Sequence, residues 1–442
     1  MNKNKVTKLN TSEQNFQSNL NKLLRNEQEI NIDIHNTVSN IIKQIQEFGD
    51  KALLDLVDKY DGIKVDKIEQ LKISQKQLKL AYTSLNNNEK EALELAAIRI
   101  RSFHQHQIPM DLEYQDDVKV DLGLKYTPVN SCGFYVPGGK AIYPSSVLMN
   151  AIPAKVAGVN RRIVVSPISD LNKSKIVLAA AYIAGVTDFI CMGGAHAIAT
   201  LAYGTETIDK VDKIVGPGNA YVAEAKRQLF GRVGIDLLAG PTETLIIADE
   251  TVDGELCAAD LLGQAEHGPT SPAVLLTNSE NLAMETMKEV DRQLKILPTG
   301  EVAGQAWSVY GQVIVCDDYE EMLGEAEKIA SEHVQVMTKN PDYFLENMTN
   351  YGALFLGPET NVSYGDKVIG TNHTLPTKGA GRYTGGLWVG KFIKTHTYQR
   401  ITEAASVEVG KYCSRLCELE GFAGHKEQAD IRLRRYAGIN EG

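Results

Sequence analysis

Apolar residues recur at helical spacing near the start of the chain, and Gly49 and Asp50 interrupt the pattern once. These apolar positions are Val38, Ile41, Ile42, Ile45, Phe48, Leu53, Leu56, Val57 and Tyr60. The spacing predicts helices on both sides of the Gly-Asp break. Residues 1–33 are polar and rich in asparagine, and we expect them to form a helical N-terminal arm that needs a partner surface.

From about residue 130 the pattern changes to short β-rich runs, most of them followed by glycines and a helix. The runs are "CGFYVPGG", "RRIVVSP", "DFICMGGAHAIA", "DKIVGPGNAYVAEAK" and "ETLIIADE". Strands that alternate with helices predict a parallel sheet with right-handed crossovers. The glycine turns would leave backbone N–H groups free at strand ends, where doubly wound sheets bind phosphates. None fits GxGxxG, and tight βα turns need the same glycines, so the pattern alone leaves dinucleotide binding open.

A second α/β stretch follows, with expected helices at 254–266, 280–294 and 318–331 and strands at 273–276, in "QVIVCD" and in "VQVMT". Beyond residue 378 the chain is rich in glycine, aromatic residues and lysine, and then helical. The predicted class is α/β, with two Rossmann-like doubly wound parallel-sheet domains plus the helical arm and a C-terminal domain. The expected boundaries are 1–33, 34–130 joined with 244–380, 131–243, and 381–442.

Composition and charge narrow the function. With 442 residues, 43% of them hydrophobic, the chain can bury a large core. Its formal net charge of −10 argues against general binding of nucleic acid. The longest apolar stretch, "IVLAAAYIAGV", is too short to span a bilayer, and the first residues lack the apolar core of a secretory signal. Its six cysteines include no CxxC pair. We therefore expect a cytoplasmic protein, without a membrane partner, that acts on a small molecule.

Two segments carry acids, amides and histidines where packing alone would not require them. In "GQAEHGP", Gln264 and His267 stand three apart at a predicted helix end, so they could share one ion, although this stretch by itself favours a solvated last turn. In "ASEHVQVM", Glu332 and His333 lie where a helix ends and a strand begins. A histidine beside a carboxylate suits general base work near neutral pH, although a helix-end histidine is the plain alternative.

Two later segments, "YGDKVIGTNH" and "EGFAGHKEQ", place polar residues among glycines. Asp366 and His373 are expected in a loop punctuated by Gly365 and Gly370, and His425 in a similar loop. Loops positioned by backbone carry function more often than packing. Taken singly, each of these residues also fits a surface or capping position.

Seven motifs together resemble the histidinol dehydrogenase family. In chain order they are "GFYVPGG…SSVLM", "GPGNAYVAEAKRQ", "AGPTETLIIAD", "DLLGQAEHGP", "SEHVQVM", "GTNHTLPT" and "EGFAGHK". The resemblance extends over roughly residues 35 to 435. It implies that 244–380 carries the metal and catalytic residues, that 131–243 binds NAD, and that 381–442 forms a homodimer.

In that family one zinc ion per subunit is held by a glutamine, two histidines and an aspartate, and the last histidine comes from the other subunit. The matching positions are Gln264, His267, Asp366 and His425. Imidazole nitrogen and carboxylate oxygen suit zinc, whereas a neutral amide oxygen is a weak ligand that leaves the ion Lewis-acidic. Glu266 does not match a ligand.

Family members oxidise a primary alcohol through an aldehyde to a carboxylate and reduce two NAD. By resemblance, His333 would take the alcohol proton and Glu332 would activate water for the second step. The positions that match the family's NAD contacts are Tyr135, His196 and Asn219. His196 departs from the pattern, because histidinol enzymes usually have glutamine there, and this places that contact in doubt.

The substrate positions of the family match Thr242, usually a serine, together with His373 and Glu420. The loop "KGAGRYTGGLWVGKFIKTHTYQR" departs from histidinol enzymes and is more similar to the sulfopropanediol dehydrogenase paralogs. Those oxidise (R)-2,3-dihydroxypropane-1-sulfonate to 3-sulfolactate by the same chemistry. Lys378, where histidinol enzymes commonly have glycine, would pair with the sulfonate; otherwise it is a solvated loop lysine. Oxidation of histidinol to histidine, a zinc hydrolase without nucleotide, and a catalytically silent NAD sensor stay open as alternatives.

Overall fold

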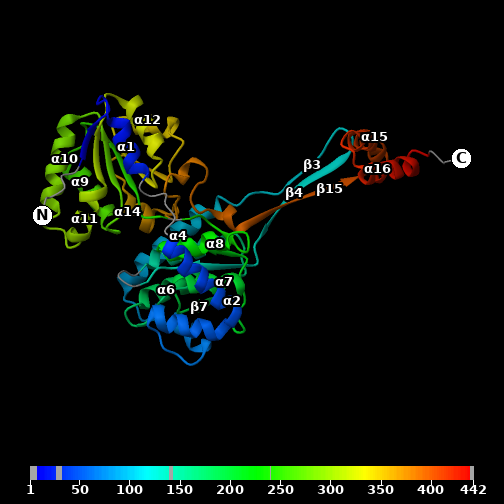
Figure 1. Cartoon of the computed structure of the whole chain (residues 1–442), viewed down its shortest axis with the longest axis horizontal. Helices are drawn as coiled ribbons and strands as arrows, with labels where there is room; N and C mark the ends of the chain where they lie inside the picture. Colours follow the sequence, from blue (N-terminus) through cyan, green and yellow to red (C-terminus); the bar gives the residue numbers. More distant parts are fainter. Residues whose placement is uncertain (1–6, 26–31, 139–142, 239, 439–442) are drawn as a thin grey trace. The chain divides into compact units, whose positions relative to one another are not determined.

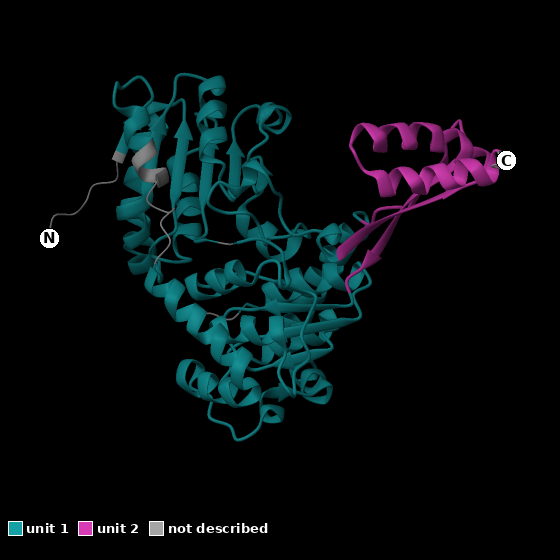
Figure 2. Ribbon diagram, turned by 45° about the vertical axis from the view of Figure 1, so that its right-hand side comes forward, with its two compact units in different colours: residues 1–107, 130–392 teal, residues 108–129, 393–442 magenta. Residues whose placement is uncertain are grey.

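The computed structural model describes residues 7–25, 32–138, 143–238 and 240–438. The chain divides into two compact units (Figure 2), residues 1–107 with 130–392 and residues 108–129 with 393–442. No helix in these described ranges is long and apolar enough to cross a membrane.

The first sheet of the larger unit is parallel and has the strand order β1-β12-β11-β10-β13-β14. Its strands are β1 (Thr7–Asn10), β10 (Thr244–Ala248), β11 (Ala273–Thr277), β12 (Gly311–Val315), β13 (His333–Met337) and β14 (Ala353–Leu356). Alternate strand residues face two apolar layers: Ile246 packs with the helices on one side, and Leu245 and Ile247 with those on the other. The first layer comprises α9 (Gly254–Ala265), α10 (Glu280–Gln293) and α11 (Gly300–Tyr310), and the second α1 (Phe16–Arg25), α12 (Tyr319–Ile329) and α13 (Pro341–Asn347) (Figure 1).

The second sheet has the order β2-β7-β6-β5-β8-β9, and all its neighbouring strands are parallel except β2 and β7. Its strands are β2 (Lys72–Ile73), β5 (Ser131–Tyr135), β6 (Arg161–Val165), β7 (Asp188–Ile190), β8 (Lys213–Val215) and β9 (Gly234–Ile235). One apolar layer on this sheet is built by α2 (Ile32–Asp61), α7 (Gly194–Tyr203) and α8 (Ala220–Leu229). The remaining helices are α3 (Gln75–Thr83), α4 (Asn87–Gln105), α5 (Pro144–Val156) and α6 (Lys175–Ala184), of which α5 contacts β5 and β6.

Short helical turns complete the larger unit: η1 (Ile68–Leu71), α14 (Val362–Tyr364), the π-helical turn η2 (Gly365–Ile369), η3 (Ala380–Arg382) and η4 (Val389–Phe392). The two expected Rossmann-like parallel sheets are therefore both present.

The N-terminal segments lie elsewhere than we expected. We had joined 34–130 to 244–380, but the apolar face of α2 packs in the same core as Ile163 and Ile214 of the second sheet. The helical arm expected at 1–33 contains a strand as well as the helix α1, because β1 extends the first sheet by pairing with β12; residues 1–6 and 26–31 lie outside the described residues. Periodicity identifies the face of an element that is buried but not the surface that covers it, which explains both differences. The break at Gly49 is a kink inside α2, where this residue has φ 50° and ψ −125°.

The smaller unit consists of an antiparallel sheet and two helices (Figures 1 and 2). Its elements are β3 (Leu112–Gln115), β4 (Val120–Pro128), β15 (Ile393–Ile401), α15 (Glu403–Leu419) and α16 (Ala423–Tyr436). β15 pairs with β4 from Ile393 opposite Pro128 to Ile401 opposite Val120. This pairing brings residues 108–129 into the unit, and 381–392 belong to the larger one, so the expected boundary at 381 differs from the structure. A strand pairing across 270 residues of sequence leaves no local signal.

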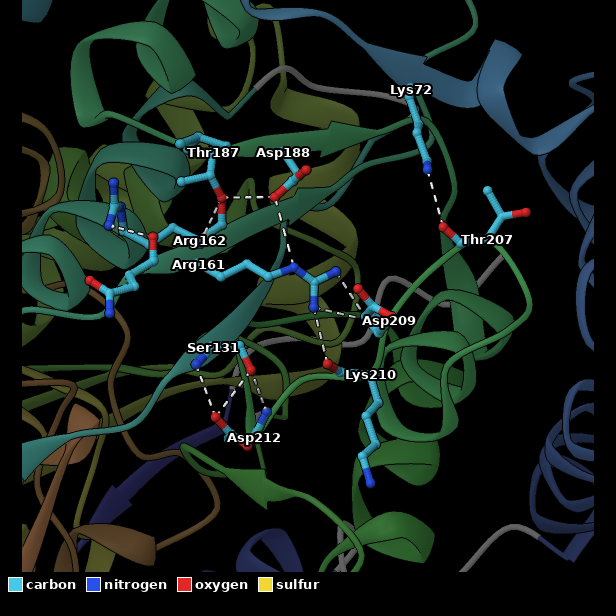
Figure 3. A network of polar contacts seen from close by, with 12 residues as sticks. Lys72, Ser131, Arg161, Arg162, Thr187, Asp188, Thr207, Asp209, Lys210 and Asp212 are labelled. Carbon is cyan, nitrogen blue, oxygen red and sulfur yellow. Dashed lines mark hydrogen bonds and ion pairs between the residues drawn. The ribbon is translucent and has the colours of Figure 1, made fainter.

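A network of polar contacts connects the amino ends of the strands in the second sheet (Figure 3). The Ser131 N–H donates to the Asp212 carboxylate at 2.9 Å, and the Arg161 guanidinium donates to the carbonyl oxygens of Asp209 and Lys210 at 3.1 Å. These bonds link the start of β5 and β6 to the turn before β8. The opposite, carboxyl edge carries the glycine loops.

Candidate active site

Loops from both sheets line one cavity of about 1150 Å³. Loops at the carboxyl ends of β5 and β8 line it, as do loops at the amino ends of β10, β11 and β13. The lining residues used below are Ser146, Pro217, Asn219, Thr242, His267, Glu332, His333, Asp366, His373 and Lys378. Small-molecule sites typically enclose 300–1,000 Å³, so this cavity has room for a large ligand or for two ligands.

One side of the cavity lies at the switch point of the second sheet. β5 and β8 are neighbours, and their loops lead to α5 and α8, the position where doubly wound sheets bind ligands. Gly216 has φ 116°, and a Cβ there would run into the carbonyl group of Tyr135, so only glycine fits this turn. Asn219 caps α8 by accepting the N–H groups of Tyr221 and Val222 at 3.1 Å.

A buried ion pair holds the backbone of the loop after β8. Lys226 Nζ donates to the Gly216 carbonyl oxygen at 3.1 Å and pairs with Asp236, whose Oδ2 accepts the Gly216 N–H at 2.7 Å. Both side chains are almost fully buried. The pair therefore fixes both backbone groups of the glycine that starts the turn.

Of the three residues expected to contact NAD, Asn219 lines the cavity, and the other two hold the neighbouring glycine loop together. The Tyr135 hydroxyl accepts the Gly194 N–H at 3.2 Å. His196 is 1% exposed, and its Nε2 lies 2.8 Å from Asp61 Oδ2. Since Asp61 ends α2, far away in sequence, no local pattern indicated that the His196 ring already has a partner.

The acid–base pair lies at the start of β13, directly beside Glu243. The Glu332 carboxylate accepts the Glu243 N–H at 3.1 Å, and His333 Nδ1 lies 3.1 Å from the Glu243 carbonyl oxygen. A carbonyl oxygen only accepts, so Nδ1 carries the proton and Nε2 is the free base. His333 Nε2 is buried without a hydrogen-bond partner and lies 3.8 Å from Asp366 Oδ1.

Burial tunes this pair toward proton transfer. Burial raises the pKa of Glu332 well above its usual value. Burial also lowers the pKa of His333, and the negative charge of the Asp366 carboxylate opposes this lowering. Burial also lowers the pKa of His373 to about 4. The imidazole of His333 is therefore neutral and able to accept a proton near neutral pH, and the Glu332 carboxyl is a stronger base than an exposed one.

Three of the four expected metal ligands come from the larger unit. His267 and Asp366 line the cavity and interact electrostatically, and Gln264 is 4% exposed. Gln264 Oε1 is buried without a hydrogen-bond partner, as a buried amide waiting for a ligand would be. Among the described residues no three His, Cys, Asp or Glu side chains are grouped to hold a metal.

Local structure around these ligands differs in part from expectation. α9 ends at Ala265, so His267 lies just beyond the helix, and its N–H donates to the Gln264 carbonyl oxygen at 3.2 Å. Asp366 lies in a π-helical turn, not in an open loop, and such turns are frequent at functional sites. His425 lies in the first turn of α16 in the smaller unit, not in a loop, and is exposed.

The expected substrate residues, like the expected metal ligands, are distributed over both units. Thr242, His373 and Lys378 line the cavity, and His373 Nδ1 lies 3.0 Å from the Asp366 carbonyl oxygen. Lys378 adopts φ 55°, a left-handed conformation that residues other than glycine rarely take. Glu420 belongs to the smaller unit, where it ends α15 and is exposed.

Sequence reasoning missed further residues of the cavity region. Glu243 stands next to Thr242 in the motif "AGPTETLIIAD" and was read only as part of a strand. Glu224 and Arg227 also line the cavity and pair with each other at 2.6 Å. Their positions continue the face of α8 that begins at Asn219, and this helical spacing was the signal that could have identified them.

Two doubly wound sheets that share one large cavity, with a buried carboxyl–imidazole pair on its wall, define a nucleotide-dependent enzyme. A profile described as Histidinol dehydrogenase matches residues 23–433. "Histidinol dehydrogenase homolog 1" of Mesorhizobium japonicum is 53% identical over 408 residues, 92% of this chain and 81% of that protein. "Histidinol dehydrogenase 1" of Trichormus variabilis is 42% identical over 433 residues, 98% of this chain and 99% of that protein.

The fold agrees with these sequence relationships. The crystal structure of histidinol dehydrogenase from Elizabethkingia anophelis superimposes with a TM-score of 0.91 at 33% identity and covers 97% of this chain and 98% of its own. The chain belongs to the histidinol dehydrogenase family, whose members are NAD-dependent oxidoreductases acting on CH–OH groups.

Proposed function

We propose that the protein oxidises (R)-2,3-dihydroxypropane-1-sulfonate through the aldehyde to 3-sulfolactate, with zinc and two molecules of NAD per product. The observation that carries the substrate choice is Lys378, a cationic side chain on the wall of the cavity that also contains Thr242 and the Glu332-His333 pair. A sulfonate is permanently anionic and offers three acceptor oxygens, so it calls for such a cation.

His333 and Glu332 divide the proton transfers of the two steps. His333 Nε2 takes the proton of the alcohol hydroxyl, because the Glu243 carbonyl oxygen keeps the other ring nitrogen protonated. Glu332 accepts a proton from the water that adds to the aldehyde, since burial makes its carboxylate more basic. NAD, when bound, supplies the hydride acceptor for each step.

Gln264, His267 and Asp366 would hold zinc together with His425 of a second subunit. The unpartnered Gln264 Oε1 and the two cavity residues support the set. Bound there, zinc would act as a Lewis acid that anchors and polarises the substrate oxygen.

NAD would bind on the side of the cavity formed by the loops after β5 and β8. Asn219, Pro217 and Ser146 line that side. Tyr135 and His196 would then act by holding the adjacent glycine loop, since their own polar groups already have protein partners. The functional form would be a homodimer in which the smaller unit supplies His425 and Glu420 to the neighbouring subunit.

One observation supports the sulfonate over histidinol. Lys378 has a left-handed backbone that glycine would adopt without strain, so a side chain there has a stability cost that a binding role would offset. The relative from Mesorhizobium japonicum, at 53% identity, is named a homolog of histidinol dehydrogenase, which agrees with a paralog and leaves the substrate open. Histidinol remains the second candidate, because His373 and Glu420 match the pattern of histidinol enzymes.

The reaction type is tested by its stoichiometry. Purified protein with zinc and limiting sulfopropanediol or histidinol should form two NADH for each alcohol consumed and yield a carboxylate. One NADH with accumulation of free aldehyde would contradict the two-step mechanism, and carboxylate formation without NADH would require another electron acceptor and would contradict the dependence on NAD.

A further inference from the structure

Glu243 connects the catalytic pair to the Lys378 loop. Its main chain holds Glu332 and His333 as described above, while its carboxylate accepts the Lys378 N–H at 2.7 Å. Glu243 is 8% exposed, so this carboxylate acts from inside the protein. One residue thus contacts the proton-transfer groups with its backbone and the loop that carries the cation with its side chain.

A second bond ties the same two segments together. The Gly240 N–H donates to Thr377 Oγ1 at 2.6 Å, one residue before Lys378. The stem of Lys378 lies so close over Gly240 that a Cβ on Gly240 would overlap it. The stem of the Lys378 side chain is therefore packed against Gly240.

The backbone of Lys378 needs such support. At φ 55° a lysine is in the left-handed region, and the following Gly379, at φ 70°, is left-handed too. A residue with a Cβ stays there only when surrounding contacts enforce it. The bond from the Lys378 N–H to the buried Glu243 carboxylate is a charge-assisted contact at that residue.

We propose that Glu243 is a positioning residue for substrate selection: its carboxylate holds Lys378 in the left-handed conformation that directs the ammonium group to the anionic end of the substrate. This inference rests on the proposed function for the identity of that anionic end. Glu243 acts through Lys378 and does not itself touch the reacting atoms.

A double-mutant cycle tests this coupling. Glu243→Asp shortens the side chain by one methylene and should raise KM for sulfopropanediol about tenfold with a much smaller change in kcat, as expected for loss of a charge-assisted hydrogen bond. Glu243→Gln keeps an acceptor oxygen at the same length and should restore most of the affinity. In a Lys378→Gly background, Glu243→Asp should change KM by less than about twofold, because the positioned side chain is missing. Equal losses in both backgrounds would overturn the proposal.

Limited trypsin digestion provides a readout that needs no substrate. Cleavage after Lys378 should be about tenfold faster in Glu243→Asp and near the wild-type rate in Glu243→Gln, whereas cleavage after the exposed Lys295 should not change. Parallel acceleration at both sites would show general destabilisation and refute a local positioning role. If digestion gives the expected pattern but the wild type prefers another alcohol, the proposed substrate fails while the positioning role stands.

Discussion

His333 Nδ1 lies 3.1 Å from the carbonyl oxygen of Glu243, a residue 90 positions earlier in the chain. This contact fixes the protonated nitrogen of the ring and leaves Nε2 as the base inside the cavity. The Glu332 carboxylate is held by the N–H of the same residue. Glu332 and His333 are therefore both oriented by the backbone of one residue, directly before β10.

The different roles proposed for His333 and Glu332 predict a different phenotype for each variant. His333→Ala should lower kcat for alcohol oxidation by about a thousandfold, the usual effect of removing a general base. Glu332→Gln should impair oxidation of the aldehyde more than that of the alcohol, because only the second step requires activated water. Single-turnover rates with each substrate measure this directly, and equal losses in both steps for both variants would contradict the assignment.

The metal assignment predicts that zinc content depends on His267 and not on its neighbour. His267→Ala should lower bound zinc, measured by atomic absorption, toward zero and abolish activity. Glu266→Ala is the matched control, since Glu266 is exposed and bonded to Thr299 outside the cavity. Full zinc occupancy in His267→Ala would exclude His267 as a ligand.

The shared site predicts complementation between inactive subunits. In a heterodimer of His267→Ala and His425→Ala chains, one of the two sites contains every wild-type ligand. Random exchange should therefore restore about a quarter of wild-type activity. Subunit exchange is verified with differently tagged chains, and an inactive mixture despite verified exchange would place all ligands in one chain.

Asp260 on α9 gives a prediction for stability and pH. Burial raises its pKa to about 6, above the usual 3.8, so the folded protein binds more protons than the unfolded chain between these values. The free energy of unfolding from this group must fall as pH rises through that window, by at most about 3 kcal/mol. Asp260→Asn should therefore stabilise the protein at about pH 7 and much less at about pH 4.

Urea unfolding at both pH values measures this difference. Asp291→Asn, an exposed substitution on α10, is the control and should leave the midpoint nearly unchanged. The same stabilisation by Asp260→Asn at both pH values would show that its carboxyl does not titrate in this window.

The strands and helices of both sheets were largely predictable, because their signals are local. The expected helix at 280–294 is α10, Glu280–Gln293, and the expected strand "VQVMT" at 334–338 overlaps β13, His333–Met337. Alternation of apolar strands, glycine turns and amphipathic helices encodes such elements within short windows. Pairings between distant segments, such as β1 with β12 or β4 with β15, have no comparable local signal.

The candidate site follows the same division. Glu332, His333, His267 and Asp366 were found from residue type and motif, and the structure brings all four to one cavity. The contacts that orient Glu332 and His333 were not predicted, because Glu243 makes them through its backbone, and the contact of Asp61 with His196 was not predicted, because Asp61 lies on another helix. Backbone partners and contacts over long sequence separations leave no trace in residue type.

The proposed role of Lys378 is to make this family member a dehydrogenase of an anionic alcohol, and steady-state kinetics with two alcohols tests it most directly. Wild-type protein should show a far higher kcat/KM for sulfopropanediol than for histidinol. Lys378→Gly should raise KM for the sulfonate about tenfold or more, equivalent to about 1.5–3 kcal/mol, while Lys378→Arg keeps the charge and most of the affinity. A clear preference of the wild type for histidinol, or an unchanged KM for the sulfonate in Lys378→Gly, would contradict the account.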